Sequence, residues 1–444
     1  MTSTEYCVKS ECDGFSSLPV QRSIVGYNNV TCKPINSLDS NTQLEFFYGG
    51  GAADMYLDLN NVYVEVELEL TPSATTTTAG PSGASPTVTK EWKTGFVNNI
   101  STSLFSQREV YINEVHITSS TSDYFNMKSY AQLMLSTTPE AANTHLVSGG
   151  FSLDIKQDGT TDGLLATNDN IGWVRRLTPF QEGKSVVLRF KMRGDIFDQP
   201  KLIPSGCDFR LRLVFADPSF YLWTNENTSD SKLVVRDASL FIRQVQVSQP
   251  TVLAHRRIHE KRNMVYDYVR SEMKTYTIPK EVNSFNFHNV YTGVLPDRIV
   301  LMLIEQDAFH GNIKKSPYNF VNANLTSISV YVNGLEQKIE NFKFGGTGNF
   351  VSAYSSFYEG LGVQGLREGG LITYPMYQHG YTMFVFDLTP DKSGHLDHKS
   401  ITQMGNLRIH GVFGQTLMAP LTAAVYADFS AVMEIDRFMK PVML

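Results

Sequence analysis

His255 and His259 have the spacing of a helical metal site but lack its other requirements. They lie four residues apart, so a helix would place both imidazoles on one face. The residues between them are Arg256, Arg257 and Ile258, so the pair lacks the carboxylate that serves as general base in a His-Glu-x-x-His site. Cationic neighbours also disfavour a divalent cation. We therefore predict a solvated connector at this point and no metal site.

A second pair, His395 and His398, lies close in sequence to Asp391 and Asp397. Imidazole and carboxylate groups together can bind zinc. The surrounding stretch is rich in Pro, Gly and Ser, a composition typical of a surface loop. We interpret this segment as such a loop and assign no metal ligands to it.

The four cysteines are Cys7, Cys12, Cys32 and Cys207. The first two have Cys-x4-Cys spacing, but no matching second pair follows and no histidine lies nearby in the N-terminal arm. A chain of this length can bury enough apolar surface to fold without cross-links. We expect free thiols in a reducing compartment and no disulfide framework.

Other patterns that often indicate catalysis are incomplete. The stretch Gly345-Gly346-Thr347-Gly348 lacks the preceding strand and the following Lys-Ser/Thr of a phosphate-binding loop. The sequence has no Gly-x-Ser-x-Gly motif and no cysteine placed as a nucleophile. Acidic residues are spread along strand faces, as Glu65, Glu67 and Glu69 show. We therefore predict no catalytic, cofactor-binding or metal-binding residues, no cofactor and no enzymatic activity.

Composition points to a β-protein with wide polar surfaces. Of 444 residues, only 18% are charged, and the net charge is −6. A protein that coats nucleic acid usually carries clustered excess Lys and Arg, so direct binding to a genome is not expected. No apolar run approaches the length of a membrane span, and the first residues lack the features of a secretory signal.

Alternating apolar and polar residues predict strands over most of the chain. The clearest is 55–70, where Val62 and every second residue after it are apolar; a slip in phase at Asn60-Asn61 predicts a bulge. Helical spacing favours helices at 122–135 and 351–361. The stretch 137–183 is interpreted as a long loop with a contact role.

Three pairs of segments recur in the same order in the two halves. Val110-Tyr111-Ile112-Asn113 matches Val330-Tyr331-Val332-Asn333, and a helix is predicted after each. The other two pairs are Phe209 to Leu213 with Asn406 to Ile409, and Arg236 to Phe241 with Tyr426 to Phe429. The shared order indicates a duplicated unit of about eight strands.

We therefore predict an all-β protein made of two tandem antiparallel jelly-roll β-sandwiches, a double jelly roll with short helices and long loops. The predicted domains are an N-terminal arm at 1–40, a first jelly roll at 41–253, a charged linker at 254–274 and a second jelly roll at 275–444. The linker is the densest charge cluster in the chain and is mostly basic.

Several segments resemble a known family. The run from Ser103 to Asn113 is similar to the first-roll motif of the major capsid proteins of the Polinton/Maverick, adintovirus and adomavirus group, as is Asp195 to Leu202 leading into Gly206 to Leu211. Similar segments of the second half are Pro296 to Val300, Ser316 to Phe320, Val330 to Gly334, Phe386 to Asp391 and Gly405 to Arg408.

The resemblance implies a hexon-like structural subunit of a double-stranded DNA virus. Such a subunit would form homotrimers of pseudo-sixfold shape that tile an icosahedral shell, and it would be made in the host cytoplasm and located in the virion. Its partners would be further copies of itself, with penton and minor capsid or cement proteins, and no sequence-specific contact with nucleic acid; contact with a membrane is left open. The alternative is a two-domain β-sandwich that binds a carbohydrate or a receptor.

Overall fold

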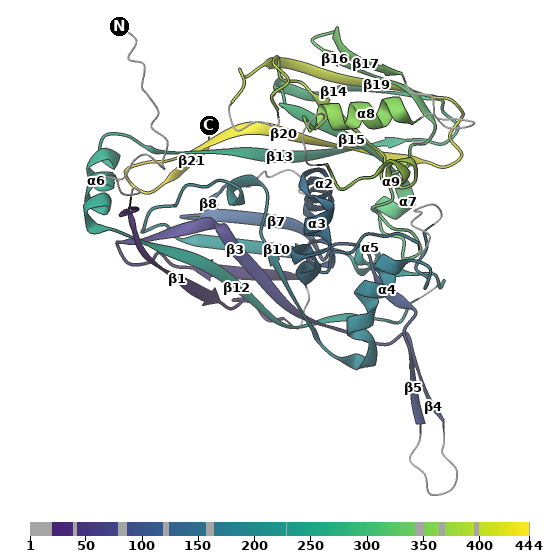
Figure 1. Ribbon diagram of the computed structural model, residues 1–444, viewed down its shortest axis with the longest axis horizontal. Helices are drawn as coiled ribbons and strands as arrows, with labels where there is room; N and C mark the ends of the chain where they lie inside the picture. The colour runs from purple at the N-terminus through teal and green to yellow at the C-terminus, as the bar shows by residue number, and fades with distance from the viewer. Residues whose placement is uncertain are drawn as a thin grey trace, which may run out of the picture.

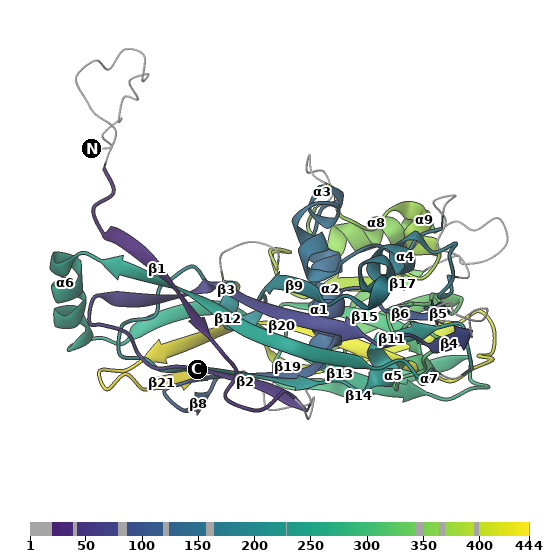
Figure 2. The same ribbon diagram turned by 90° about the horizontal axis from the view of Figure 1, so that it is seen from below.

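The computed structural model describes residues 20–38, 42–78, 87–118, 124–156, 164–227, 229–341, 350–363, 369–394 and 399–443. Two β-sandwiches lie side by side, one formed by the N-terminal half and one by the C-terminal half (Figure 1). Their long strands run along the longest axis of the molecule, as the view from below also shows (Figure 2).

The first sandwich contains eight strands in two sheets, of order β1-β12-β3-β9 and β2-β10-β7-β8. Their bounds are β1 (Ile24–Cys32), β2 (Gln43–Tyr48), β3 (Met55–Leu70), β7 (Phe105–Ile112), β8 (Val115–His116), β9 (Val186–Lys191), β10 (Phe209–Phe215) and β12 (Leu233–Val247).

The second sandwich also has two sheets, one of order β13-β20-β15-β18 to which the short β21 (Pro441–Met443) adds a fifth strand, and one of order β14-β19-β16-β17. Their bounds are β13 (Met264–Ile278), β14 (Ser284–Val294), β15 (Arg298–Glu305), β16 (Leu325–Val332), β17 (Leu335–Asn341), β18 (Met383–Asp387), β19 (Met404–Phe413) and β20 (Leu421–Ile435).

The two sandwiches have the same topology. Counted in chain order within each half, the strands of both follow the order 1-8-3-6 in one sheet and 2-7-4-5 in the other. Eight antiparallel strands in two such sheets make a jelly roll. The predicted all-β double jelly roll is thus confirmed, and each of the three sequence matches falls on equivalent strands, namely the fourth, the seventh and the eighth.

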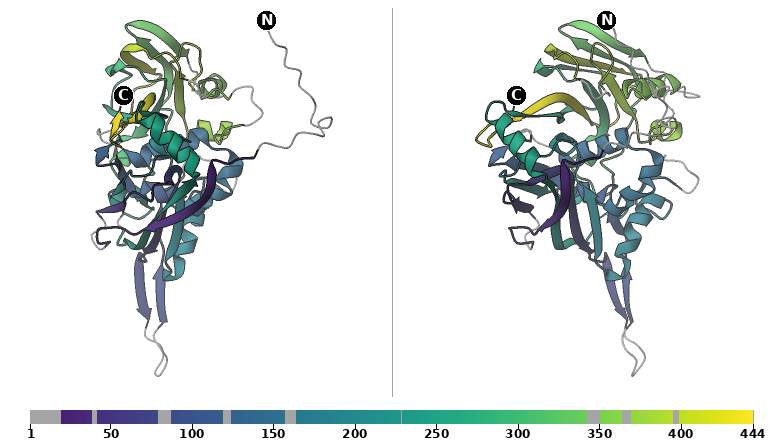
Figure 3. Two further views of the ribbon diagram at one scale, coloured as in Figure 1. Left: turned by 90° about the vertical axis from the view of Figure 1, so that its left-hand side faces the viewer. Right: turned by 60° about the vertical axis from the view of Figure 1, so that its left-hand side comes forward.

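Short elements complete the fold. The hairpin of β4 (Ala74–Thr78) and β5 (Thr87–Glu91) projects from the body of the molecule (Figure 3), and β6 (Thr94–Phe96) pairs with β11 (Leu222–Thr224). β21 (Pro441–Met443) pairs with β20. The helices are α1 (Ile100–Ser103), α2 (Phe125–Ser136), α3 (Pro139–Ala142), α4 (Ile171–Leu177), α5 (Pro218–Tyr221), α6 (Gln249–His259), α7 (Gln306–Phe309), α8 (Val351–Gly360) and α9 (Tyr374–Gln378), with 3-10 turns η2 (His145–Gly149), η3 (Thr178–Gly183) and η4 (Asp195–Phe197).

The longest strand of the first roll shows how the sequence pattern becomes a sheet. In β3 the apolar residues from Val62 to Leu70 are buried, and the residues between them face outward, as a period of two requires. Val62 pairs with Ile242, but the next residue of β12, Arg243, pairs with Asp58. The residues between Asp58 and Val62 therefore bulge out of the ladder, and the predicted bulge at Asn60-Asn61 is confirmed.

The fourth strand of each roll ends in the same turn. Asn113 and Glu114 both have positive φ, as do Asn333 and Gly334. Positive φ at both central residues is typical of a type I′ turn, whose twist matches the right-handed twist of the flanking strands. The turn asparagine also reaches the seventh strand. Its Oδ1 accepts the backbone N–H of Asp208 in the first roll, at 2.7 Å, and of Asn406 in the second, at 3.0 Å.

Both predicted helices are confirmed, at α2 and α8, but three predicted segments contain secondary structure that the sequence did not indicate. Residues 24–32 of the expected arm form β1, which pairs with β12. Residues 264–274 of the expected linker belong to β13, and residues 249–259 form helix α6. The expected loop at 137–183 contains short helices, among them α4, whose first turn is capped by the Asn170 side chain.

We predict that Asn333→Ala lowers the free energy of unfolding by about 2 kcal/mol. About half of this loss comes from forcing alanine to positive φ and half from removing the side-chain hydrogen bond to Asn406. Asn333→Gly accepts positive φ freely and loses only the side-chain hydrogen bonds, the one from Asn406 and a longer one to the carbonyl oxygen of Met404 at 3.4 Å, so it should cost about 1 kcal/mol. Denaturant unfolding of both variants measures the difference; equal stability of the alanine variant and the wild type would contradict the role given to this turn.

Candidate functional site

The histidine pair on α6 anchors the helix. His255 Nδ1 lies 3.1 Å from the hydroxyl of Tyr56, and the Nε2 of buried His259 lies 3.0 Å from the carbonyl oxygen of Ile435. The two imidazoles therefore engage different partners. The expectation of a solvated connector is wrong for His259, because the end of β20 covers it. Among the described residues no group of three His, Cys, Asp or Glu side chains could hold a metal ion.

Several other sequence candidates lie outside the described residues: His395, Asp397 and His398, the glycine stretch 345–348, and Cys7 and Cys12. Asp391 is described, and its Oδ1 accepts hydrogen bonds from the hydroxyls of Ser393 and Ser400 at 2.6 and 3.0 Å. Those contacts stabilise a turn, and both use this carboxylate oxygen as the hydrogen-bond acceptor.

The two described cysteines are free thiols. Cys207 is buried, and burial raises the pKa of its thiol to about 12. Cys32 is half-buried, and burial again raises its thiol pKa. Because the thiolate is the reactive form, neither residue is prepared for nucleophilic chemistry.

The outer faces of the first roll carry ladders of opposite charge. On one sheet Glu69 pairs with Arg236 at 2.6 Å and Glu65 with Arg189 at 3.7 Å. On the other sheet Arg212 pairs with Glu109 at 3.2 Å. Exposed pairs of this kind contribute little to stability. Because opposite charges are paired, these faces are polar but carry little net charge. Such a face can contact water or a polar surface of another protein.

Aromatic side chains dominate the contact between the two rolls. Tyr130 of α2 stacks on Tyr318 of the second half, with ring centroids 3.9 Å apart and planes at 18°. Phe220 meets the same tyrosine edge-on at 6.0 Å. The Tyr318 hydroxyl lies 2.7 Å from Ser103 Oγ, so its polar end is satisfied inside the interface. Each such aromatic pair adds about 1 kcal/mol beyond the area that it buries.

A buried charge network joins the rolls beside this cluster. Asp195, at positive φ in η4, forms an ion pair with Arg108 of β7. The same carboxylate accepts hydrogen bonds from the backbone N–H and the hydroxyl of Ser271 in β13, at 2.8 and 3.2 Å. Lys128 of α2 donates to the carbonyl oxygen of Ser271 at 3.2 Å. One carboxylate thus connects both halves of the chain.

The pKa of Asp195 lies below its ordinary value. Burial by itself would raise this pKa, but the positive charges of Lys128 and Arg108 and the two bonds from Ser271 outweigh it. The group is therefore ionised in the folded protein at neutral pH. Its charge is offset by two cations of the first half, and the second half adds two hydrogen bonds from Ser271.

Further buried contacts tie the rolls together at the other end of the interface. Arg176 of α4 pairs with Asp154 at 2.6 Å, and the Tyr381 hydroxyl donates to the Asp154 carbonyl oxygen at 3.3 Å. The indole N–H of Trp223 donates to the carbonyl oxygen of Lys314 at 3.2 Å. These contacts fix the orientation of one roll against the other.

A hollow between the rolls has a volume of about 690 Å³, and its lining includes several charged side chains among polar and apolar ones. Its charges pair with one another: Asp267 with Lys399 at 2.5 Å and with Lys201 at 3.4 Å, and Arg298 with Asp428 at 2.6 Å. Of these pairs, Lys201 with Asp267 joins the two halves and the other two lie within the second half. Carboxylates that are held in ion pairs are poorly placed for acid-base chemistry. No described helix is long and apolar enough to cross a bilayer.

Sequence reasoning identified the interface residues only as parts of resembling segments. Arg108, Asp195 and Tyr318 all belong to segments that resemble the capsid family, and the structure brings these three segments together. The partners, however, are distant in the chain: Asp195 and Ser271 are 76 residues apart and Ser103 and Tyr318 are 215 apart.

Comparison with solved structures identifies the fold. A chain of the Sputnik virophage, determined by cryo-EM, superposes with a TM-score of 0.66 at 13% identity, covering 100% of this chain and 93% of that one. The chain has the double jelly-roll fold of viral major capsid proteins. The mavirus major capsid protein (TM-score 0.52, 10% identity, 100% and 96% covered) and the Faustovirus major capsid protein (TM-score 0.52, 10% identity, 94% and 92% covered) share this fold.

The fold implied by the family resemblance is therefore confirmed. No protein-family model matches the sequence. An uncharacterized protein of Caenorhabditis elegans is 21% identical over 361 residues, which covers 78% of this chain and 81% of that protein. This similarity extends over most of the double jelly roll.

We expect Asp195→Asn to lower the free energy of unfolding by about 3 kcal/mol at pH 7, because Arg108 is left buried without its partner charge. A lowered folded pKa means that the ionised carboxylate stabilises the fold at neutral pH and that this contribution is lost as the pH falls through that pKa. The deficit of the variant should therefore shrink once the pH drops below the ordinary value of 3.8.

Denaturant unfolding across this pH range measures the effect. Asp237→Asn is the matched control: it removes an exposed ion pair with Lys33 and should cost less than about 1 kcal/mol. A deficit for Asp195→Asn that stays constant down to pH 3 would show that the carboxylate charge does not hold the rolls together.

Proposed function

We propose that the chain is the structural subunit of an icosahedral viral capsid and that it assembles as a homotrimer. The observation that carries this proposal is the repeated topology: one chain presents two jelly rolls of identical strand order, packed against each other through one apolar core. Three such chains around a closed threefold axis place six similar lobes in a ring. A three-chain capsomer can then occupy a lattice position with six neighbours.

The solved proteins of the same fold support this role. Mavirus and Faustovirus use chains of this architecture as major capsid proteins, and the likeness to the Sputnik chain extends over both rolls. By this account the protein has a structural task in the virion and no catalytic one. Penton and minor capsid proteins are the further partners that a closed shell would require.

Strand β1 offers a surface that a neighbouring subunit would cover. It is the outer strand of its sheet, and Figure 3 shows it along the outside of the molecule. Val25 and Tyr27 on this strand are 67% and 65% exposed. A sheet edge with large exposed apolar side chains favours pairing with another chain.

Size-exclusion chromatography with light scattering at low micromolar concentration tests the proposal. Three chains of 49.8 kDa give a particle of about 149 kDa. Permanent interfaces of this kind commonly bury more than about 2,000 Å², so little monomer should remain. A clean monomer near 50 kDa that persists on concentration would contradict the capsid role and favour a carbohydrate- or receptor-binding β-sandwich.

Charge substitution locates the contact. The double variant Val25→Glu/Tyr27→Glu should shift the particle toward the monomer mass if β1 lies in the interface. Leu335→Glu is a matched control, since this side chain is 70% exposed but lies at the start of β17 in the other roll. A trimer that resists the β1 substitutions would leave the assembly standing and move the contact elsewhere.

A further inference from the structure

One end of the long axis is formed by helix α6 and the turn between β20 and β21. Figures 1 and 2 show α6 at this extreme, with the helix running across the end of the molecule. The His259 contact with Ile435 ties the helix to the turn, and Asn263 Nδ2 donates to Glu434 at 2.8 Å. We refer to residues 249–263 and 436–440 together as the basic end.

The basic end carries unpaired positive charge. Its six exposed cations are Arg256, Arg257, Lys261, Arg262, Arg437 and Lys440. None of them forms an ion pair with another described residue, whereas most cations of the sheets do. Of its two carboxylates, Glu260 is exposed and Asp436 accepts the backbone N–H groups of Phe438 and Lys440, at 2.8 and 2.9 Å.

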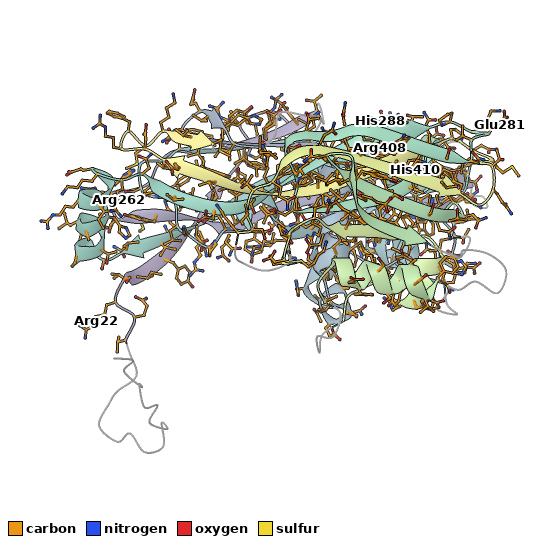
Figure 4. All side chains as sticks on the ribbon, turned by 90° about the horizontal axis from the view of Figure 1, so that it is seen from above. Arg22, Arg262, Glu281, His288, Arg408 and His410 are labelled. Carbon is orange, nitrogen blue, oxygen red and sulfur yellow. The ribbon has the colours of Figure 1, made fainter. Side chains whose placement is uncertain are left out.

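This concentration of charge runs against the net charge of the chain, which is −6. The remainder of the protein is correspondingly more negative, so the molecule has a positive end. Arg22 lies at the same end as Arg262 (Figure 4), and Ser23 joins this segment to the start of α6 through a hydrogen bond to Ser248. Cations in the last turn of a helix stabilise its dipole, but that effect does not account for Arg437 and Lys440.

Large apolar side chains are exposed among these cations. Leu253 is 52% exposed, Ile258 is 58% exposed and Phe438 is 75% exposed. The opposite side of α6 is buried: Val252 packs on Tyr56 in a small apolar cluster. A short helix with one face anchored and with Leu, Ile and Arg on the other has the character of an interfacial membrane helix.

We propose that the basic end binds the surface of an anionic phospholipid bilayer. The arginines and lysines contact headgroup phosphates, and Leu253, Ile258 and Phe438 enter the boundary between headgroups and acyl chains. Nucleic acid fits the observations less well, because phosphate contacts alone would not use three exposed apolar side chains. A symmetric contact between two copies of this end would bring like charges together. The inference goes beyond the capsid role and does not depend on trimer formation.

Vesicle co-sedimentation of the full chain provides the test. Vesicles of phosphatidylcholine with about 30% phosphatidylserine should bind the protein roughly tenfold or more tightly than phosphatidylcholine alone, since each cation near an anionic surface adds to the attraction. Binding should weaken as salt rises from about 0.1 M, because exposed charges are screened. Equal binding to both vesicles, or none to either, would overturn the proposal.

Matched variants assign the effect to this end. Arg257→Glu/Lys261→Glu should reduce binding to the anionic vesicles roughly tenfold or more. Arg175→Glu/Lys232→Glu changes the net charge equally, through exposed cations of α4 and of the residue before β12, and should leave binding unchanged. An equal loss in both pairs would mean that only net charge matters and would contradict the proposal.

Removing the apolar side chains separates a bilayer from nucleic acid. Leu253→Ser/Ile258→Ser keeps every charge, so weakened vesicle binding is expected and supports insertion. Retention on a short DNA duplex without vesicle binding would instead identify a nucleic-acid surface. Light scattering on the same variants completes the test: a change in particle mass would assign this end to contacts between copies of the chain. Thermal unfolding confirms that each variant is folded.

Discussion

The two rolls share one apolar core, and this constraint governs the rest of the structure. The buried side chains of both sandwiches form a single connected cluster. Within it Tyr130 stacks on Tyr318, and Asp195 binds Arg108 from one half and Ser271 from the other. Burying a carboxylate is costly unless its charge and its hydrogen bonds are satisfied. The hydrogen bonds from Ser271 to Asp195 and from Lys128 to Ser271 form only when the rolls lie in this orientation, so they favour it over others.

A fixed angle between the lobes is what an assembling subunit needs. If the rolls moved independently, association of neighbouring chains would also lose the conformational entropy of that motion, which would weaken binding. With the angle set inside the chain, the geometry of the proposed three-chain ring would follow from the subunit alone. The outer faces of the first roll carry paired charges and are polar. The exposed sheet edge at β1 differs from them, because its apolar side chains suit contact with another subunit.

The fold could be predicted from the sequence where its signals are local. Strand alternation, the bulge after Asp58 and the asparagine turns at Asn113 and Asn333 each depend on a few consecutive residues. Strand β1 was not predicted. Both of its faces are largely exposed, so its sequence lacks the alternation of apolar and polar residues that indicates a strand. In β13 the charged side chains of residues 264–274 obscured a strand whose buried positions include Tyr266 and Tyr268.

The interface could not be predicted in the same way. No local pattern shows that Ser103 contacts Tyr318 or that Asp195 contacts Ser271. Both contacts depend on how the two folded sandwiches pack against each other. The resemblance did mark the segments that contain Ser103, Asp195 and Tyr318. Their meeting at one interface gives a physical reason for those residue types, because they hold the rolls together.

Negative-stain electron microscopy of the purified protein tests the central claim most directly. If two like lobes in a fixed orientation assemble around a threefold axis, class averages will show particles with a near-hexagonal outline and six lobes around a centre. Separate two-lobed particles at micromolar concentration would contradict the account.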